Sequence, residues 1–170
     1  MSMIWLAASF DNYLVLFELQ YFPGNVFVNT AAGAVSDILA FVTSGVLLSF
    51  ISFDKTLSLS FFIGLAGGLS ICFMATNPGN QWIFPLCVLL AKFGISSAYN
   101  ICYMANGLLF PTQIAATTLG ICNLFARCAT IFAPFVAAVF ETPRTPMIIF
   151  STIALFALIA SFLLKKPSVL

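Results

Sequence analysis

The sequence predicts an all-α, polytopic membrane protein, and its composition and segment lengths indicate this fold class. The chain has 170 residues, of which 62% are hydrophobic and only 6% are charged, and its mean hydropathy is +1.11. Soluble domains carry roughly 25% charged residues, so this chain could not cover a globular surface with polar side chains. A soluble all-helical core is the alternative, but the number and length of the apolar segments argue against it.

Six apolar segments are predicted as membrane-spanning helices, because a span needs roughly 20 apolar residues. Turns rich in Gly, Pro, Asn or charge divide them. All connections are short, so we expect successive helices to be antiparallel neighbours. The predicted spans form a single domain over residues 1–170 and cover about residues 4–21, 26–50, 57–75, 81–109, 113–140 and 147–164.

Small residues and one proline predict how these helices pack. Gly64, Gly67 and Gly68 lie in the third segment and permit close approach of a neighbouring helix. Pro134 lies inside the fifth segment, where it removes a backbone hydrogen bond and predicts a kink.

Several functional classes are excluded by what the chain lacks. The net charge is +1 with few, scattered charges, so a nucleic-acid surface is not expected. The chain has no histidine, and its five cysteines lie in apolar runs without a CxxC pair, which predicts buried hydrophobic side chains, no metal site and no cofactor. No nucleophile–base pair is visible, so we expect no enzyme and no catalytic residues. Met1-Ser2-Met3 lacks a positive start, and no cleavable signal peptide is expected.

Two cations lie deep inside apolar segments. Lys92 is in the fourth segment and Arg127 is in the fifth, and a charge near the bilayer centre normally faces a partner or a wet cavity. Each belongs to a polar stripe in which residues recur at spacings of three and four. The two stripes are Lys92, Ser96, Tyr99, Asn100, Tyr103 and Asn106, and Gly120, Asn123, Arg127, Thr130 and Pro134.

Three acids are candidate charge partners for these cations. Asp37 lies in the second segment on a face with Asn29, and Asp11 and Glu18 lie in the first segment, seven residues apart and roughly on one face. Two interpretations are open. The charges form internal ion pairs that hold helices together, or a bound anion bridges both cations.

With these residues laid out, the chain resembles the C-terminal six-helix half of the organic cation/anion (carnitine-type) transporters of the major facilitator superfamily. The resemblance covers nearly the whole chain. It is carried by Gly24-Asn25 with Asn29, Lys92-Phe93-Gly94 with Ser97-Ala98-Tyr99-Asn100, Phe110-Pro111-Thr112, and Ala126-Arg127 with Ala133-Pro134-Phe135.

The resemblance implies that the first, second, fourth and fifth helices line half of a central substrate cavity, with both termini in the cytoplasm. Anion and carnitine-type members carry arginine at the position of Arg127, so the implied substrate is a small organic anion or zwitterion. The implied membrane is the plasma membrane, and the implied partner is a complementary six-helix half or a second copy. The expected substrate-binding residues are Lys92, Arg127, Tyr99, Asn100, Tyr103 and Asn123.

Three departures from the family pattern favour an alternative. Leu108 stands where the family usually has a glutamate, Ala115 where it has an arginine, and Lys55 where it has a double arginine. In the family those charges form a cytoplasmic latch. The alternative is a non-transporting structural subunit among other membrane subunits, for example of a respiratory complex in the mitochondrial inner membrane.

Overall fold

The computed structural model of the chain describes residues 1–22, 25–74, 83–140 and 144–163, and no strand occurs among them. The predicted all-α fold class is confirmed. In chain order the helices are α1 (Ser2–Glu18), α2 (Val26–Phe50), α3 (Phe53–Met74), α4 (Phe84–Leu109), α5 (Thr112–Thr130), α6 (Phe132–Val139) and α7 (Arg144–Leu163).

The membrane-spanning character of the fold is also confirmed. Within the described ranges, five helical stretches are long and apolar enough to cross a membrane: α2, α3, α4, α7 and the stretch Thr112–Val139 that joins α5 to α6. A lipid bilayer is therefore the surrounding solvent. Helix α1 has 17 residues and is about 26 Å long, slightly less than the roughly 30 Å hydrocarbon core. Its place as a sixth span stays a prediction.

Some helix ends differ from the predicted limits. Helix α1 ends at Glu18 instead of residue 21, because the chain tightens into a turn in which the Tyr21 N–H donates to the carbonyl of Glu18. Helix α3 begins at Phe53 instead of residue 57, because Asp54 suits the positive end of a helix and extends the first turn into the expected loop. The predicted limits at residues 75, 81 and 164 lie outside the described residues.

The fifth predicted span is interrupted near Pro134. Helix α5 ends at Thr130 and α6 begins at Phe132, with Ile131 between them. In a continuous helix the nitrogen of residue 134 would donate to the carbonyl of Thr130, and proline has no N–H to donate. The interruption thus falls where the missing bond predicts it, one turn before the proline itself.

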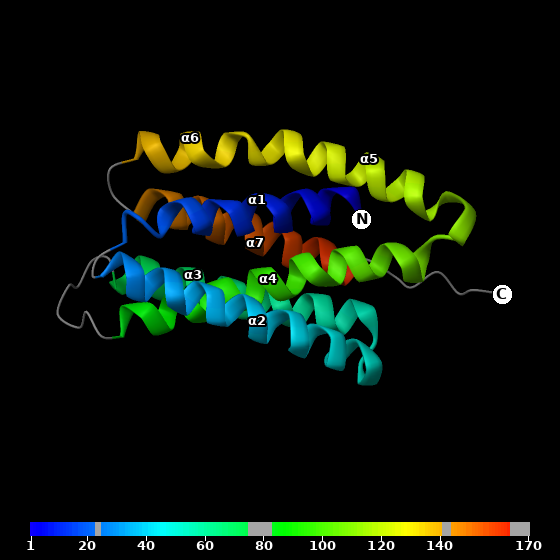
Figure 1. Cartoon of the computed structure of the whole chain (residues 1–170), viewed down its shortest axis with the longest axis horizontal. Coiled ribbons are helices and arrows are strands. Elements are labelled where there is room, and N and C mark those ends of the chain that lie inside the picture. The colour runs from blue at the N-terminus through cyan, green and yellow to red at the C-terminus, as the bar shows by residue number, and fades with distance from the viewer. Residues whose placement is uncertain (23–24, 75–82, 141–143, 164–170) are drawn as a thin grey trace.

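The helices pack into an elongated bundle in which α1 is central to one half and α4 to the other. Helix α1 contacts α4, α5, α6 and α7, whereas α4 contacts α2 and α3, and α3 also contacts α7. Figure 1 shows α5 and α6 along one long edge of the bundle and α2 along the opposite edge, with α1 and α4 between them. Residues of α1 and α4 can therefore meet residues of α2 on one side and residues of α5 on the other.

Glycine allows the closest of these contacts, between α3 and α4. A Cβ atom on Gly94 would overlap the backbone of Gly64, and one on Gly67 would overlap the backbone of Ala91. A Cβ atom on Gly68 would overlap the Phe150 ring of α7. The prediction that these glycines of the third segment permit close helix approach is confirmed, and α4 is fixed in position by its contact with α3.

Helix α2 is mostly exposed and buries only a narrow stripe. The buried residues recur at intervals of three or four and are Asn29, Gly33, Ser36, Ala40 and Ser44. The outward side carries large apolar side chains, including Phe27, which is 84% exposed, and Ile38, which is 65% exposed. Such a surface suits lipid or another membrane segment.

Candidate functional site

A polar cluster around a buried lysine joins α1, α2 and α4. We call Lys92, Ser96, Asp37 and Asn12 the Lys92 cluster. Lys92 is only 3% exposed, and its Nζ atom donates a hydrogen bond to Asn12 Oδ1 at 2.5 Å and lies 3.6 Å from Asp37 Oδ1. The Ser96 hydroxyl donates to the same Asp37 oxygen at 2.5 Å. A buried ammonium needs both a countercharge and hydrogen-bond acceptors, and this cluster supplies both.

Hydrogen bonds on either side of this cluster hold α2 against α4. Ser36 Oγ donates to the carbonyl of Leu89 at 2.8 Å, and Asn100 Nδ2 donates to Ser44 Oγ at 2.7 Å. Lys92 and Ser96 are four residues apart and therefore lie on one face of α4. The predicted site residue Asn100 thus binds α2 and is not joined to Arg127.

A second polar cluster joins α1, α4 and α5. We call Arg127, Tyr13, Tyr99, Tyr103 and Asn123 the Arg127 cluster. The guanidinium of Arg127 donates to the Tyr13 hydroxyl, and its Cζ atom lies 5.4 Å from the centroid of the Tyr13 ring. The Tyr99 and Tyr103 hydroxyls are 2.9 Å apart, and Tyr103 donates to Asn123 Oδ1 at 3.3 Å. Asn123 and Arg127 are four residues apart in α5 and therefore lie on one face of that helix.

The two cations have different surroundings. Lys92 is buried beside a carboxylate, whereas Arg127 is exposed, and no ion pair to Arg127 occurs among the described residues. Tyr13 offers Arg127 a hydroxyl and not a carboxylate, so this contact supplies no countercharge. The prediction that both cations share one hollow stays a prediction, although each cluster includes one of two consecutive residues of α1, Asn12 or Tyr13.

Asn12 and Tyr13 are the site residues that the sequence analysis missed. They are consecutive in α1, and because successive helical residues differ by about 100° in direction, Asn12 reaches α4 while Tyr13 reaches α5. A signal was present, since Asp11-Asn12-Tyr13 is a polar run inside an apolar segment. Periodicity alone does not say which neighbours such a run will meet.

Two of the three acids expected as charge partners do not pair with the cations. Asp37 pairs with Lys92. Asp11 and Glu18 are both fully buried in α1, and their carboxyl oxygens have no hydrogen-bond partner among the described residues. The face of α1 that carries them is not the face that Tyr13 presents to Arg127.

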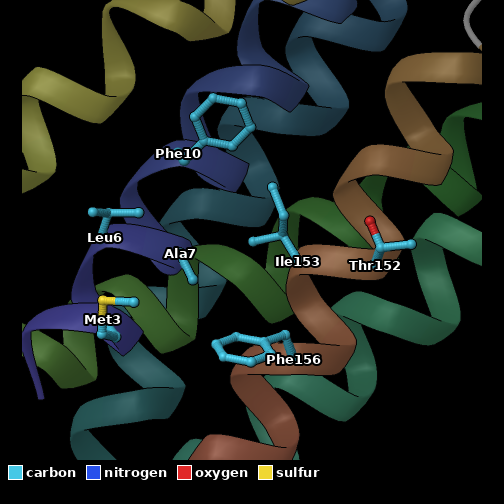
Figure 2. Close-up of a pocket in the computed structure, with 7 residues that line it drawn as sticks. All are labelled: Met3, Leu6, Ala7, Phe10, Thr152, Ile153 and Phe156. Carbon is cyan, nitrogen blue, oxygen red and sulfur yellow. The ribbon is translucent and has the colours of Figure 1, made fainter.

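The bundle also has two apolar grooves on α7, away from both clusters. One has a volume of about 360 Å³ and lies between α1 and α7. Figure 2 shows Met3, Leu6 and Phe10 of α1 facing Ile153 and Phe156 of α7 in this groove. The other, of about 570 Å³, lies between α3 and α7 and includes Arg144. The lining of the first groove suits lipid acyl chains better than a charged solute.

Comparison with known proteins shows that the chain is similar to solute carriers and transporters of organic ions. No family model matches the chain. Solute carrier family 22 member 15 of Xenopus tropicalis is 28% identical over 98% of this chain and 32% of the relative. The rat (Rattus norvegicus) organic anion transporter 3 is 26% identical over 98% of the chain and 31% of the relative. The human (Homo sapiens) organic cation/carnitine transporter 2 is 22% identical over 78% of the chain and 24% of the relative.

The chain therefore spans about a quarter to a third of the length of the curated relatives that it matches. These relatives are transporters and not enzymes, and their names give no support to the mitochondrial alternative. The predicted resemblance is confirmed: along nearly its whole length, this membrane chain is similar to part of the organic cation, organic anion and carnitine transporters of solute carrier family 22.

Proposed function

We propose that the chain forms half of the solute pathway of a plasma-membrane transporter for a small organic anion or zwitterion. One observation carries the proposal most directly. Arg127 is an exposed cation inside an apolar helical stretch, and it has no acidic partner among the described residues. A permanent charge at such a position is costly unless water or a ligand meets it, and an anionic solute would supply the missing countercharge.

The surroundings of Arg127 suit a carboxylate ligand. A guanidinium presents donors in a planar fork that matches a carboxylate. The hydroxyls of Tyr99 and Tyr103 and the amide of Asn123 lie in the same cluster and could bind further solute oxygens. A quaternary ammonium on a zwitterion would be attracted to the faces of the tyrosine rings. Lys92 attracts an anionic solute less strongly than Arg127 does, because Asp37 already compensates the charge of Lys92.

The proposed pathway requires a second membrane unit. Transporters of this general type hold the solute between two halves that move against each other. Helix α5 is exposed over most of its length, and it carries Arg127 and Asn123 of the Arg127 cluster. A complementary six-helix half, or a second copy of the chain, would complete the site from this side.

Ligand binding to the purified chain, together with any unit that accompanies it in mild detergent, tests the proposal. Benzoate and carnitine should raise the melting temperature, and tetraethylammonium, a cation without a carboxylate, should raise it less. Arg127→Gln should weaken benzoate binding about tenfold or more, since a hydrogen bond to a charged group is worth about 1.5–3 kcal/mol. Arg144→Gln, which removes an exposed arginine at the start of α7, is the matched control.

Equal benzoate binding by wild type, Arg127→Gln and Arg144→Gln would count against the anion site. The structural-subunit alternative is tested by the same purification. A stable assembly of many unrelated subunits, with no stabilisation by any of the three ligands, would favour that alternative. Recovery with one complementary half, or as a pair of identical chains, would favour the transporter.

A further inference from the structure

Helix α1 buries two carboxyl groups that neither polar cluster uses. Asp11 lies near the middle of the helix and Glu18 is its last residue, and both side chains are 0% exposed. Because they are seven residues apart, they lie on one face and about 10.5 Å from each other along the axis. None of their four oxygens has a hydrogen-bond partner within the described residues.

The rest of that face is apolar. The other buried residues of α1 that surround the two acids along the helix include Ile4, Ala8, Leu14 and Val15, and they belong to the main hydrophobic core. No polar side chain of α1 on this face offers either acid a partner. The two carboxyl groups are therefore in a hydrocarbon-like medium instead of a hydrated site.

The helices that pack on α1 carry titratable or charged groups, but none is bonded to either acid. In the described residues, Lys92 is bonded to Asn12 and Asp37, and Arg127 is bonded to Tyr13. Helix α6 contributes no charged or titratable group, and Arg144 is at the start of α7. The remaining titratable groups are Cys87, Tyr99, Cys102 and Tyr103 on α4 and Cys122 and Cys128 on α5.

An ionised carboxylate in such a place would cost several kcal/mol. A second membrane unit could not supply a compensating cation by direct contact, because both side chains are already completely covered. Protonation removes the charge and leaves a neutral carboxylic acid, which a core of this kind tolerates far better. The packed arrangement of α1 is thus compatible with bound protons and not with two carboxylates.

We propose that Asp11 and Glu18 are proton-binding sites of this membrane domain. Each holds a proton while α1 is packed against α4, α5, α6 and α7, and each releases it to water when α1 separates from these helices. Protonation then favours the packed state and deprotonation the separated one, which is a population shift set by differential proton affinity. If the proposed transport function holds, on which this last step rests, solute transfer is coupled to protons.

Infrared spectroscopy of the purified chain in lipid nanodiscs tests proton binding directly. At neutral pH, wild type should show the C=O stretching band of protonated carboxyl groups. Asp11→Asn and Glu18→Gln should each remove part of the band, and the double variant should remove it. Asp54→Asn, an equivalent change at a partly exposed acid in the first turn of α3, should leave the band unchanged.

A wild-type chain without this band at neutral pH overturns the proposal, and so does a band that persists in a folded double variant. The amides mimic the shape and neutrality of the carboxylic acids, so we expect the variants to fold. If the variants do not fold, the pH dependence of the infrared band of the wild-type chain decides whether the proposal holds. A band that disappears reversibly on raising the pH supports the sites, and a band absent at every pH overturns them.

Carnitine uptake into vesicles, with and without a pH gradient, tests the coupling separately. Uptake by wild type should respond to the gradient, and uptake by the double variant should not. A gradient response that persists in the double variant overturns the coupling by these residues. Absence of carnitine, benzoate and tetraethylammonium uptake in wild type would contradict the transport function, and the infrared band would still decide whether Asp11 and Glu18 hold protons.

Discussion

The Lys92 cluster and the Arg127 cluster place the same charge in opposite physical situations. Lys92 is 3% exposed and is held by a carboxylate and an amide oxygen. Arg127 is exposed and contacts a hydroxyl and not a carboxylate. The first arrangement fixes three helices together, while the second leaves a cation available. Buried charge by itself therefore does not mark a binding site, and its compensation within the chain decides between a structural and a ligand-binding role.

The largest effect is expected on breaking the Lys92 cluster. Asp37→Asn would leave the buried ammonium of Lys92 without its countercharge and should lower the free energy of unfolding by about 3 kcal/mol, the low end of the range for buried pairs, because the Asp37 side chain is 35% exposed. Chemical denaturation in micelles measures this change. Asp54→Asn serves as the control, and the double change Lys92→Met/Asp37→Leu should recover much of the stability because no lone charge remains. A small effect of Asp37→Asn would mean that Lys92 is not compensated as described.

A somewhat smaller effect is expected on displacing α4 without touching any polar residue. In Gly94→Ala the new methyl group would overlap the backbone of Gly64, and overpacking of this kind costs about 1–3 kcal/mol. Gly107→Ala is the matched control, since it lies in the same helix with no atom near the added Cβ position. The melting temperature should fall for Gly94→Ala alone. Equal melting temperatures would show that α3 and α4 do not meet here.

A modest loss of benzoate affinity is expected when the hydrogen bond that orients Arg127 is removed. Tyr13→Phe keeps the ring beneath the guanidinium but removes the hydroxyl that Arg127 bonds. The hydrogen bond holds the guanidinium in place without contacting the solute, so its loss should cost about 1 kcal/mol of binding free energy. Benzoate affinity should therefore fall several-fold, as measured by titration calorimetry. Tyr21→Phe removes a hydroxyl from the exposed turn after α1 and should not change the affinity. An unchanged affinity in both variants would separate Tyr13 from the proposed site.

The smallest effect on stability is expected at Arg127 itself. Because its side chain is exposed, Arg127→Gln should change the free energy of unfolding by no more than about 0.5 kcal/mol. The same variant is expected to lose most of its benzoate binding. A large loss of stability in the denaturation measurement would move Arg127 into the same structural class as Lys92 and remove the contrast between the clusters.

Much of the fold follows from local sequence signals. Apolar length and turn residues predicted the helices to within a few residues, because a chain in a bilayer must satisfy its backbone hydrogen bonds internally. The helix interruption followed from the missing N–H of Pro134. Glycine spacing in the third segment predicted close helix approach, and the structure supplies Gly94 and Ala91 as the matching residues.

The site could be predicted only in part, because its connections depend on tertiary contacts. Periodicity placed Lys92, Tyr99 and Asn100 together on one side of a helix, but Asn100 bonds α2 while Tyr99 lies with the Arg127 cluster. Neither Asn12 nor Tyr13 could be assigned a neighbour before the position of α1 was known. The packing of α1 also explains why Asp11 is separated from both cations.

Consecutive placement of Asn12 and Tyr13 on a rigid helix has a thermodynamic consequence. If a ligand that draws Tyr13 and Arg127 into a new position also turns α1, Asn12 moves relative to Lys92. Coupling of this kind is reciprocal. If bound ligand changes the equilibrium for forming the Lys92–Asp37 pair by some factor, then formation of the pair changes the affinity for the ligand by the same factor. Lys92 can in this way change the affinity for a solute that it does not contact.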